Sequence, residues 1–105
     1  CPTLSQRCDI LRKHIVPRVT KRLNVTHVLD HDAIELLAEV SERRDDGMRG
    51  AEKDVDNSMS FAQLQSAERG DDNGKRITRT FVQETLAREE TKRSMRNVPP
   101  VGMYT

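Results

Sequence analysis

A stripe of apolar residues opens the chain. They recur at spacings of three and four over 4–23, which predicts one long amphipathic helix. The stripe consists of Leu4, Cys8, Leu11, Ile15, Val19 and Leu23. Pro17 falls inside this pattern. Because proline lacks a backbone N–H and crowds the preceding turn, we expect a kink or a break there.

Two further helical patterns follow a connector at 24–29, in which Val25 and Val28 suit extended backbone. The first pattern covers 31–42, and Asp30 before it is suited to an N-cap. Its inward positions are Ala33, Ile34, Leu37 and Val40. The second pattern covers 48–67, and its small residues permit close approach of another helix. Its predicted buried stripe is Met48, Ala51, Val55, Met59 (or Ser58) and Ala62.

The last third of the chain combines a turn, a short strand and a helix. Glycine, aspartate and asparagine at 70–74 predict the turn, and 75–78 suits a short strand around Ile77. A last helix begins near 78–80, where Thr80 and Gln83 fit a capping box. Its apolar side consists of Phe81, Val82, Thr85, Leu86 and Met95.

These elements predict a mostly α fold, a small four-helix bundle with one short strand. We expect this domain to cover 1–96 and an extended proline-containing tail to cover 97–105. A length of 105 residues fits one small domain. With 34% hydrophobic and 3% aromatic residues, its core is lean and aliphatic. We expect such a core to be marginally stable alone and to need contact with a partner.

The net charge of +1 hides an uneven layout. Residues 1–23 carry +5, residues 24–74 carry −8 and residues 75–105 carry +4. This order lets the two ends fold back on the middle, or lets each face meet a different neighbour. The basic residues have no interleaved aromatics for base stacking, so they do not favour nucleic acid as the partner.

The two cysteines, Cys1 and Cys8, are too few for a disulfide scaffold. On one helix they lie roughly 10 Å apart, beyond the reach of a disulfide of about 7 Å. We therefore expect two reduced thiols and an intracellular, reducing compartment, the cytoplasm or the mitochondrial matrix. No run approaches the roughly 20 apolar residues of a membrane span, so no membrane is expected. The start, without Met or an apolar signal region, suggests a cut or processed piece.

Candidate chemistry is sparse. No phosphate loop, nucleophile elbow or zinc cysteine pair is present, so we expect no catalytic residue. His27 and His31 have metal-ligand spacing, but a helix start between them separates the rings. Surface histidines and no metal site are therefore expected. Four acidic residues also fall in predicted turns, where turn and cap roles explain them: Asp45, Asp46, Asp71 and Asp72.

The turn that opens the third helix is different. Gly47 frees the backbone for a sharp turn, and Arg49 then sits in the first helical turn. An arginine is unusual there, since the helix dipole favours acids at that end. Beside free backbone N–H groups its guanidinium could form an anion site. The alternative is that Arg49 pairs with Asp45, Asp46 or Glu52.

The whole arrangement resembles a known family over about 9–86. It looks like the small α-helical lid that follows the nucleotide-binding core in AAA+ ATPases, as in Lon proteases and in Clp unfoldases and disaggregases. Similar motifs are HIVPR at 14–18, DAI at 32–34 and, most specifically, GMRGAEKDV at 47–55. A charged turn, a short strand and a last helix follow in the family, as at 75–78 and 81–86.

The resemblance implies that Arg49 is the sensor-2 residue and that Gly47 shapes its turn. ATP, with Mg, would be bound mainly by a core domain absent from this chain. The lid would belong to an ATP-hydrolysing unfoldase, chaperone or ATP-dependent protease that acts on protein substrates. Its partners would be that core and the neighbouring subunit of a ring oligomer.

The chain departs from the family in three places, of which one is the Pro99-Pro100 tail, which matches neither the Lon nor the Clp pattern. The stretch SERRDD at 41–46 is more polar than the Lon pattern, and Gly50-Ala51 stands where Clp lids often have Pro-Leu. Lon and Clp types remain open, since His14 and Pro17 resemble Lon whereas LLAE at 36–39 resembles Clp. The alternative function is a helical protein-interaction module without a nucleotide role.

Overall fold

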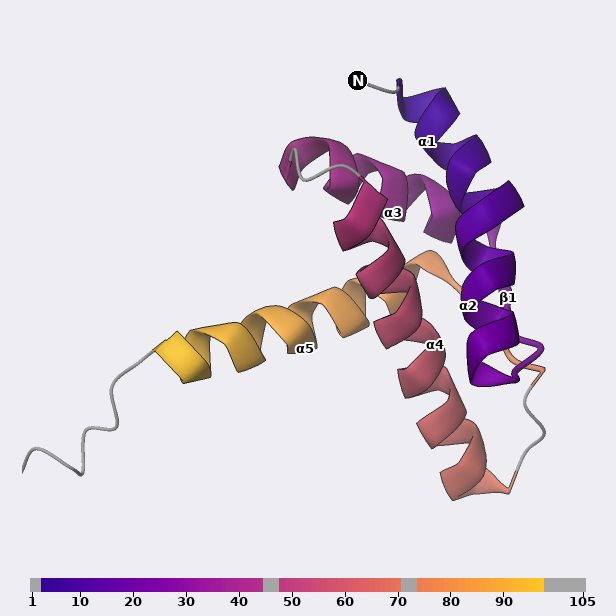
Figure 1. Ribbon diagram of the computed structural model, residues 1–105. Coiled ribbons are helices and arrows are strands. Elements are labelled where there is room, and N and C mark those ends of the chain that lie inside the picture. Colours follow the sequence, from indigo (N-terminus) through magenta and orange to yellow (C-terminus); the bar gives the residue numbers. More distant parts are fainter. Residues whose placement is uncertain (1–2, 45–47, 71–73, 98–105) are drawn as a thin grey trace, which may run out of the picture.

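The computed structural model describes residues 3–44, 48–70 and 74–97, with side chains up to residue 92. Four helices and a pair of very short strands make up these ranges (Figure 1). The mostly α, four-helix prediction is confirmed. The tail at 98–105 lies outside the described residues, and the last helix runs to Asn97, one residue past the predicted domain end.

Of the kink or break expected at Pro17, the break does not occur, because the first helix is continuous from Leu4 to Leu23. It comprises α1 (Leu4–Ile10), a π-helical segment η1 (Leu11–Ile15) and α2 (Val16–Leu23). In η1 the Val16 N–H donates to the Leu11 carbonyl five residues back. Pro17 then stands at the start of α2. The wider turn accommodates the proline ring, and the axis bends between α1 and α2 (Figure 1).

The predicted strand around Ile77 has a partner that the sequence pattern did not specify. β1 (Val28–Leu29) lies parallel to β2 (Arg76–Ile77), with Leu29 opposite Ile77. The Asp30 N–H donates to the Ile77 carbonyl at 2.9 Å. A single strand leaves its backbone polar groups unpaired, so the strand at Ile77 needs this second one. Leu29 and Ile77 are buried and point into the core.

Helix α4 (Met48–Arg69) is the central element and packs against α2, α3 (His31–Arg44) and α5 (Arg79–Asn97). The predicted stripe on α4 is confirmed, with Met48 partly buried. Ser58 is fully buried as well. The fully buried members of the stripe are Ala51, Val55, Met59 and Ala62.

Helix α5 begins with a different cap from the one predicted. The Phe81 N–H donates to Thr78 Oγ1 at 3.2 Å, so Thr78, not Thr80, caps the helix. Val82 and Thr85 are buried as expected, while the side chain of Met95 is outside the described part. The cap two residues earlier directly follows β2, so strand and helix join without a loop.

The two basic ends fold back on the acidic middle. Arg18 and Arg22 on α2 pair with Glu52 and Asp56 on α4. From the other end, ion pairs join Arg76 to Asp30 and Arg79 to Glu39. The prediction that the two basic ends fold back on the acidic middle is therefore confirmed. Across 3–44, 48–70 and 74–97, no helix is long and apolar enough to cross a membrane.

Candidate functional site

Arg49 is the second residue of α4, and its side chain is exposed. It makes no hydrogen bond or ion pair within the part of the chain that the structure describes. Gly47, the other predicted site residue, lies outside the described residues, as do Asp45 and Asp46. The role of Gly47 stays a prediction.

Glu52, one of the partners considered for Arg49, is engaged elsewhere. Its Oε1 lies 2.6 Å from Arg18 Nη1, and its Oε2 lies 3.7 Å from Arg22 Nη1. Arg22 also binds Asp56, and this hydrogen bond raises the pKa of the Arg22 guanidinium. These four residues form a continuous row of alternating charge, the α2–α4 ion-pair row. Arg49 stands beside the row without joining it.

A depression of about 390 Å³ lies between the first helix and the start of α4. Arg18, Arg49 and Glu52 supply its polar lining, and the apolar lining comes from Ile10, Ile15 and Met48. Glu52 already balances the Arg18 charge, so among the described lining residues the charge of Arg49 has no counter-charge. A guanidinium with free N–H groups beside apolar surface suits a phosphate or carboxylate oxygen.

The prediction of two surface histidines is wrong for His27, which is only 3% exposed. Its Nδ1 accepts a hydrogen bond from the Lys75 N–H at 2.9 Å. Nε2 therefore carries the proton and donates to Gln63 Oε1 at 3.2 Å. This neutral ring joins the segment before β1 to the residue before β2 and to α4.

His31 is exposed, as predicted, and lies 2.8 Å from Glu35. The two histidines thus have separate partners. Within the described ranges, no three His, Cys, Asp or Glu residues gather as a metal-ligand group. The four acidic residues of the predicted turns all lie outside those ranges: Asp45, Asp46, Asp71 and Asp72.

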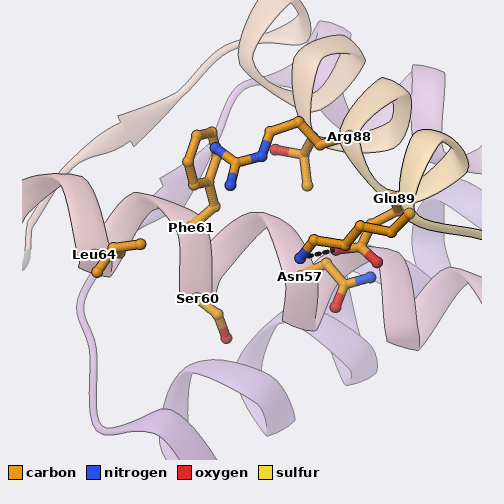
Figure 2. A pocket seen from close by; sticks show the side chains of 8 residues that line it. Asn57, Ser60, Phe61, Leu64, Arg88 and Glu89 are labelled. Carbon is orange, nitrogen blue, oxygen red and sulfur yellow. Dashed lines mark ion pairs between the residues drawn. The ribbon is translucent and has the colours of Figure 1, made fainter. Parts of the chain in front are cut away.

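The structure also contains a pocket that the sequence did not predict. A pocket of about 250 Å³, here called the α4–α5 groove, lies between these helices (Figure 2). Helix α4 contributes Asn57, Ser60, Phe61 and Leu64. Helix α5 contributes Thr85, Arg88, Glu89 and Lys92. No local signal could have found it, because Phe61 and Arg88 are far apart in the sequence and meet only through helix packing.

No family model, curated protein or solved structure matches this chain.

Proposed function

We propose that this chain is the lid domain of an ATP-dependent AAA+ unfoldase or protease and that Arg49 senses the bound nucleotide. One observation carries the assignment. Arg49 is exposed, free of ion pairs among the described residues, and beside a depression at the start of a 22-residue helix. Of the carboxylates considered as partners of Arg49, Glu52 binds Arg18 instead, and Asp45 and Asp46 lie outside the described residues.

The chemistry follows from the guanidinium. A separate core would hold ATP and Mg, and Arg49 would reach from the lid toward the γ-phosphate. Its planar fork can bind two phosphate oxygens at once and stabilise the charge of the transferring group. Loss of the γ-phosphate would release this contact and let the lid move as a rigid body against the core and the next subunit.

The α2–α4 ion-pair row would support that motion. Arg18 and Glu52 tie the first helix to the opening turns of α4, on which Arg49 sits. Together with the buried contacts of α4, the row holds Arg49 at a fixed place on the domain. A force that Arg49 receives would therefore move the whole domain rather than one side chain.

The test is Arg49→Ala in the full-length protein that contains this chain. Removal of one such contact is expected to lower the ATP hydrolysis rate by roughly tenfold or more. The matched control is Arg69→Ala, which removes an exposed arginine from the opposite end of the same helix. It should leave the rate unchanged. Unchanged hydrolysis and unchanged nucleotide affinity in Arg49→Ala would overturn the assignment.

A simpler observation comes first. The reading frame upstream of Cys1 should encode a nucleotide-binding core with Walker motifs. A frame without such a core would favour the helical interaction module instead.

A further inference from the structure

The α4–α5 groove is built around an unusual stack of side chains (Figure 2). The Arg88 guanidinium carbon lies 3.9 Å from the centroid of the Phe61 ring. Phe61 in turn contacts Phe81 with 5.2 Å between ring centroids, and Lys75 Nζ lies 4.6 Å from the Phe81 centroid. Two cations thus enclose two aromatic rings. Each cation–ring contact favours this arrangement, so the stack holds Arg88 against α4.

Arg88 keeps its hydrogen-bonding capacity in this position. It forms no hydrogen bond or ion pair with any residue that the structure describes. Lys92, the other cation of the groove, is 3.6 Å from Glu89 and so has a counter-charge. A guanidinium held against a ring, with no hydrogen bond to a described residue, is preorganised for a carboxylate or a phosphate.

The size of the groove limits the ligand. Its volume of about 250 Å³ falls below the range of roughly 300–1,000 Å³ that is typical of small-molecule sites. It suits one or two side chains of a larger partner. Leu64, also in the lining, is 53% exposed, and only Val28 is more exposed among the described large hydrophobic residues. An aliphatic side chain of the partner would cover it.

The stack of side chains also favours a protein over a nucleic acid as the ligand of the groove. Unspecific binding of single strands depends on open aromatic faces for base stacking. In this groove Arg88 covers one face of Phe61, and Phe81 packs against the same ring. A base therefore finds no free ring, whereas a carboxylate beside an aliphatic side chain finds both Arg88 and Leu64.

We propose that the α4–α5 groove binds an acidic segment of a partner protein. Arg88 takes a carboxylate of the partner, and Leu64 packs against a neighbouring aliphatic side chain. The charges agree, because the lining carries Arg88 and Lys92 against the single carboxylate of Glu89. This surface is distinct from the depression beside Arg49, which shares none of its lining residues.

The experiment uses the 105-residue chain labelled with ¹⁵N and a blocked peptide of sequence Ala-Leu-Glu-Glu-Leu-Ala as the probe. Titration to about 5 mM covers the weak affinity, near 1 mM, expected of a two-side-chain contact. Amide signals of 57–64 and 85–92 should shift together. Arg88→Gln should weaken binding roughly tenfold, since a charge-assisted hydrogen bond is lost, and Leu64→Ser should weaken it severalfold.

Three controls sharpen the result. Arg43→Gln removes an equal charge from an exposed site on α3 and should not alter the affinity. Arg88→Lys keeps the charge but loses the fork, so its affinity should lie between those of the wild type and Arg88→Gln. Arg49→Ala should bind the peptide normally, which separates this proposal from the proposed nucleotide role. Thermal unfolding followed by circular dichroism checks that each variant is folded.

Several outcomes would overturn the proposal. One is the absence of groove shifts at the highest peptide concentration. Another is equal affinity of Arg88→Gln and the wild type. A third is equal binding of the peptide after both glutamates are changed to glutamine. A fourth is tighter binding of a short oligothymidylate that also depends on Arg88, which would make the groove a phosphate site.

Discussion

Arg44 Nη1 lies 3.0 Å from Asp54 Oδ2, in an ion pair that joins the end of α3 to the second turn of α4. The Asp54 side chain is only 2% exposed, and that of Arg44 is 28% exposed. The pair is also close at the second oxygen, where Arg44 Nη2 donates to Oδ1 at 3.3 Å. A carboxylate so deeply buried depends on its partners to replace water.

Arg44→Ala should therefore destabilise the domain strongly. It leaves the buried Asp54 carboxylate with one counter-charge fewer, and loss of one partner of a buried pair costs about 3 kcal/mol. Urea unfolding measures the change. The matched variant is Arg22→Ala, which breaks the exposed pairs with Glu52 and Asp56 and should cost much less, because water already solvates these charges. Equal losses in the two variants would contradict this difference in burial.

Two buried serines should respond in opposite directions to alanine. Ser58 is fully buried, and its hydroxyl has no hydrogen-bond partner in the described part of the chain. Ser58→Ala removes an unsatisfied polar group and should raise the free energy of unfolding by about 1 kcal/mol. Ser41 Oγ accepts a hydrogen bond from the buried Arg7 at 2.6 Å, so Ser41→Ala should lower it by about 2 kcal/mol. A loss of stability in Ser58→Ala would show that its hydroxyl is satisfied after all.

The two histidines offer a similar comparison. His27→Ala leaves the Lys75 N–H and the Gln63 amide without their buried partner and opens a cavity beside β2. We expect a cost of about 2 kcal/mol. His31→Ala, at an exposed site, should change stability by less than about 0.5 kcal/mol. Thermal unfolding at pH 7.5 compares both variants, and a His27→Ala domain as stable as the wild type would contradict the hydrogen-bond assignment.

The Cys8 thiol should react slowly with alkylating reagents. Burial, and next the Glu35 carboxylate, raise its pKa above the ordinary value of about 9. The thiolate is the reactive form, so the alkylation rate at pH 8 should be below that of a free cysteine and should rise with pH. Glu35→Gln should increase the rate, whereas Glu84→Gln on the exposed side of α5 should not. Mass spectrometry in a Cys1→Ser background follows the reaction.

The same shift has a consequence for stability. A thiol whose pKa is raised in the folded state keeps its full contribution below pH 9 and loses it as the pH rises through the folded value. The domain should therefore lose some stability in alkaline solution. Cys8→Ser should remove that part of the loss, which unfolding curves at pH 8 and pH 10.5 would reveal.

Helices and their buried faces could be predicted from the sequence because their signal is local. The spacing of Leu11, Ile15 and Val19 requires no knowledge of the rest of the chain, and all three are buried. The strand at Val28–Leu29 could not be predicted in the same way. Two residues carry no periodicity, and their pairing depends on β2 far along the chain.

The continuity of the helix at Pro17 and the error at Thr80 have physical causes too. The helix continues through Pro17 because η1 forms a widened π-helical turn just before it. Pro17 then stands at the start of α2, where a missing backbone N–H is tolerated. Thr78 and Thr80 are both capable caps, and the position of β2 decides between them. For the sites, the dipole argument singled out Arg49, whereas Arg88 acquires its setting only from Phe61 on another helix.

The parallel pairing of β1 with β2 has a consequence for the order of folding. The connection between the strands contains the whole of α3 and α4, so the strands meet only after a long loop has closed. Closure of such a loop costs chain entropy that two short strands cannot repay alone. We therefore expect the packed pair of α3 and α4 to assemble first and the strand pair to join in one of the last steps of folding.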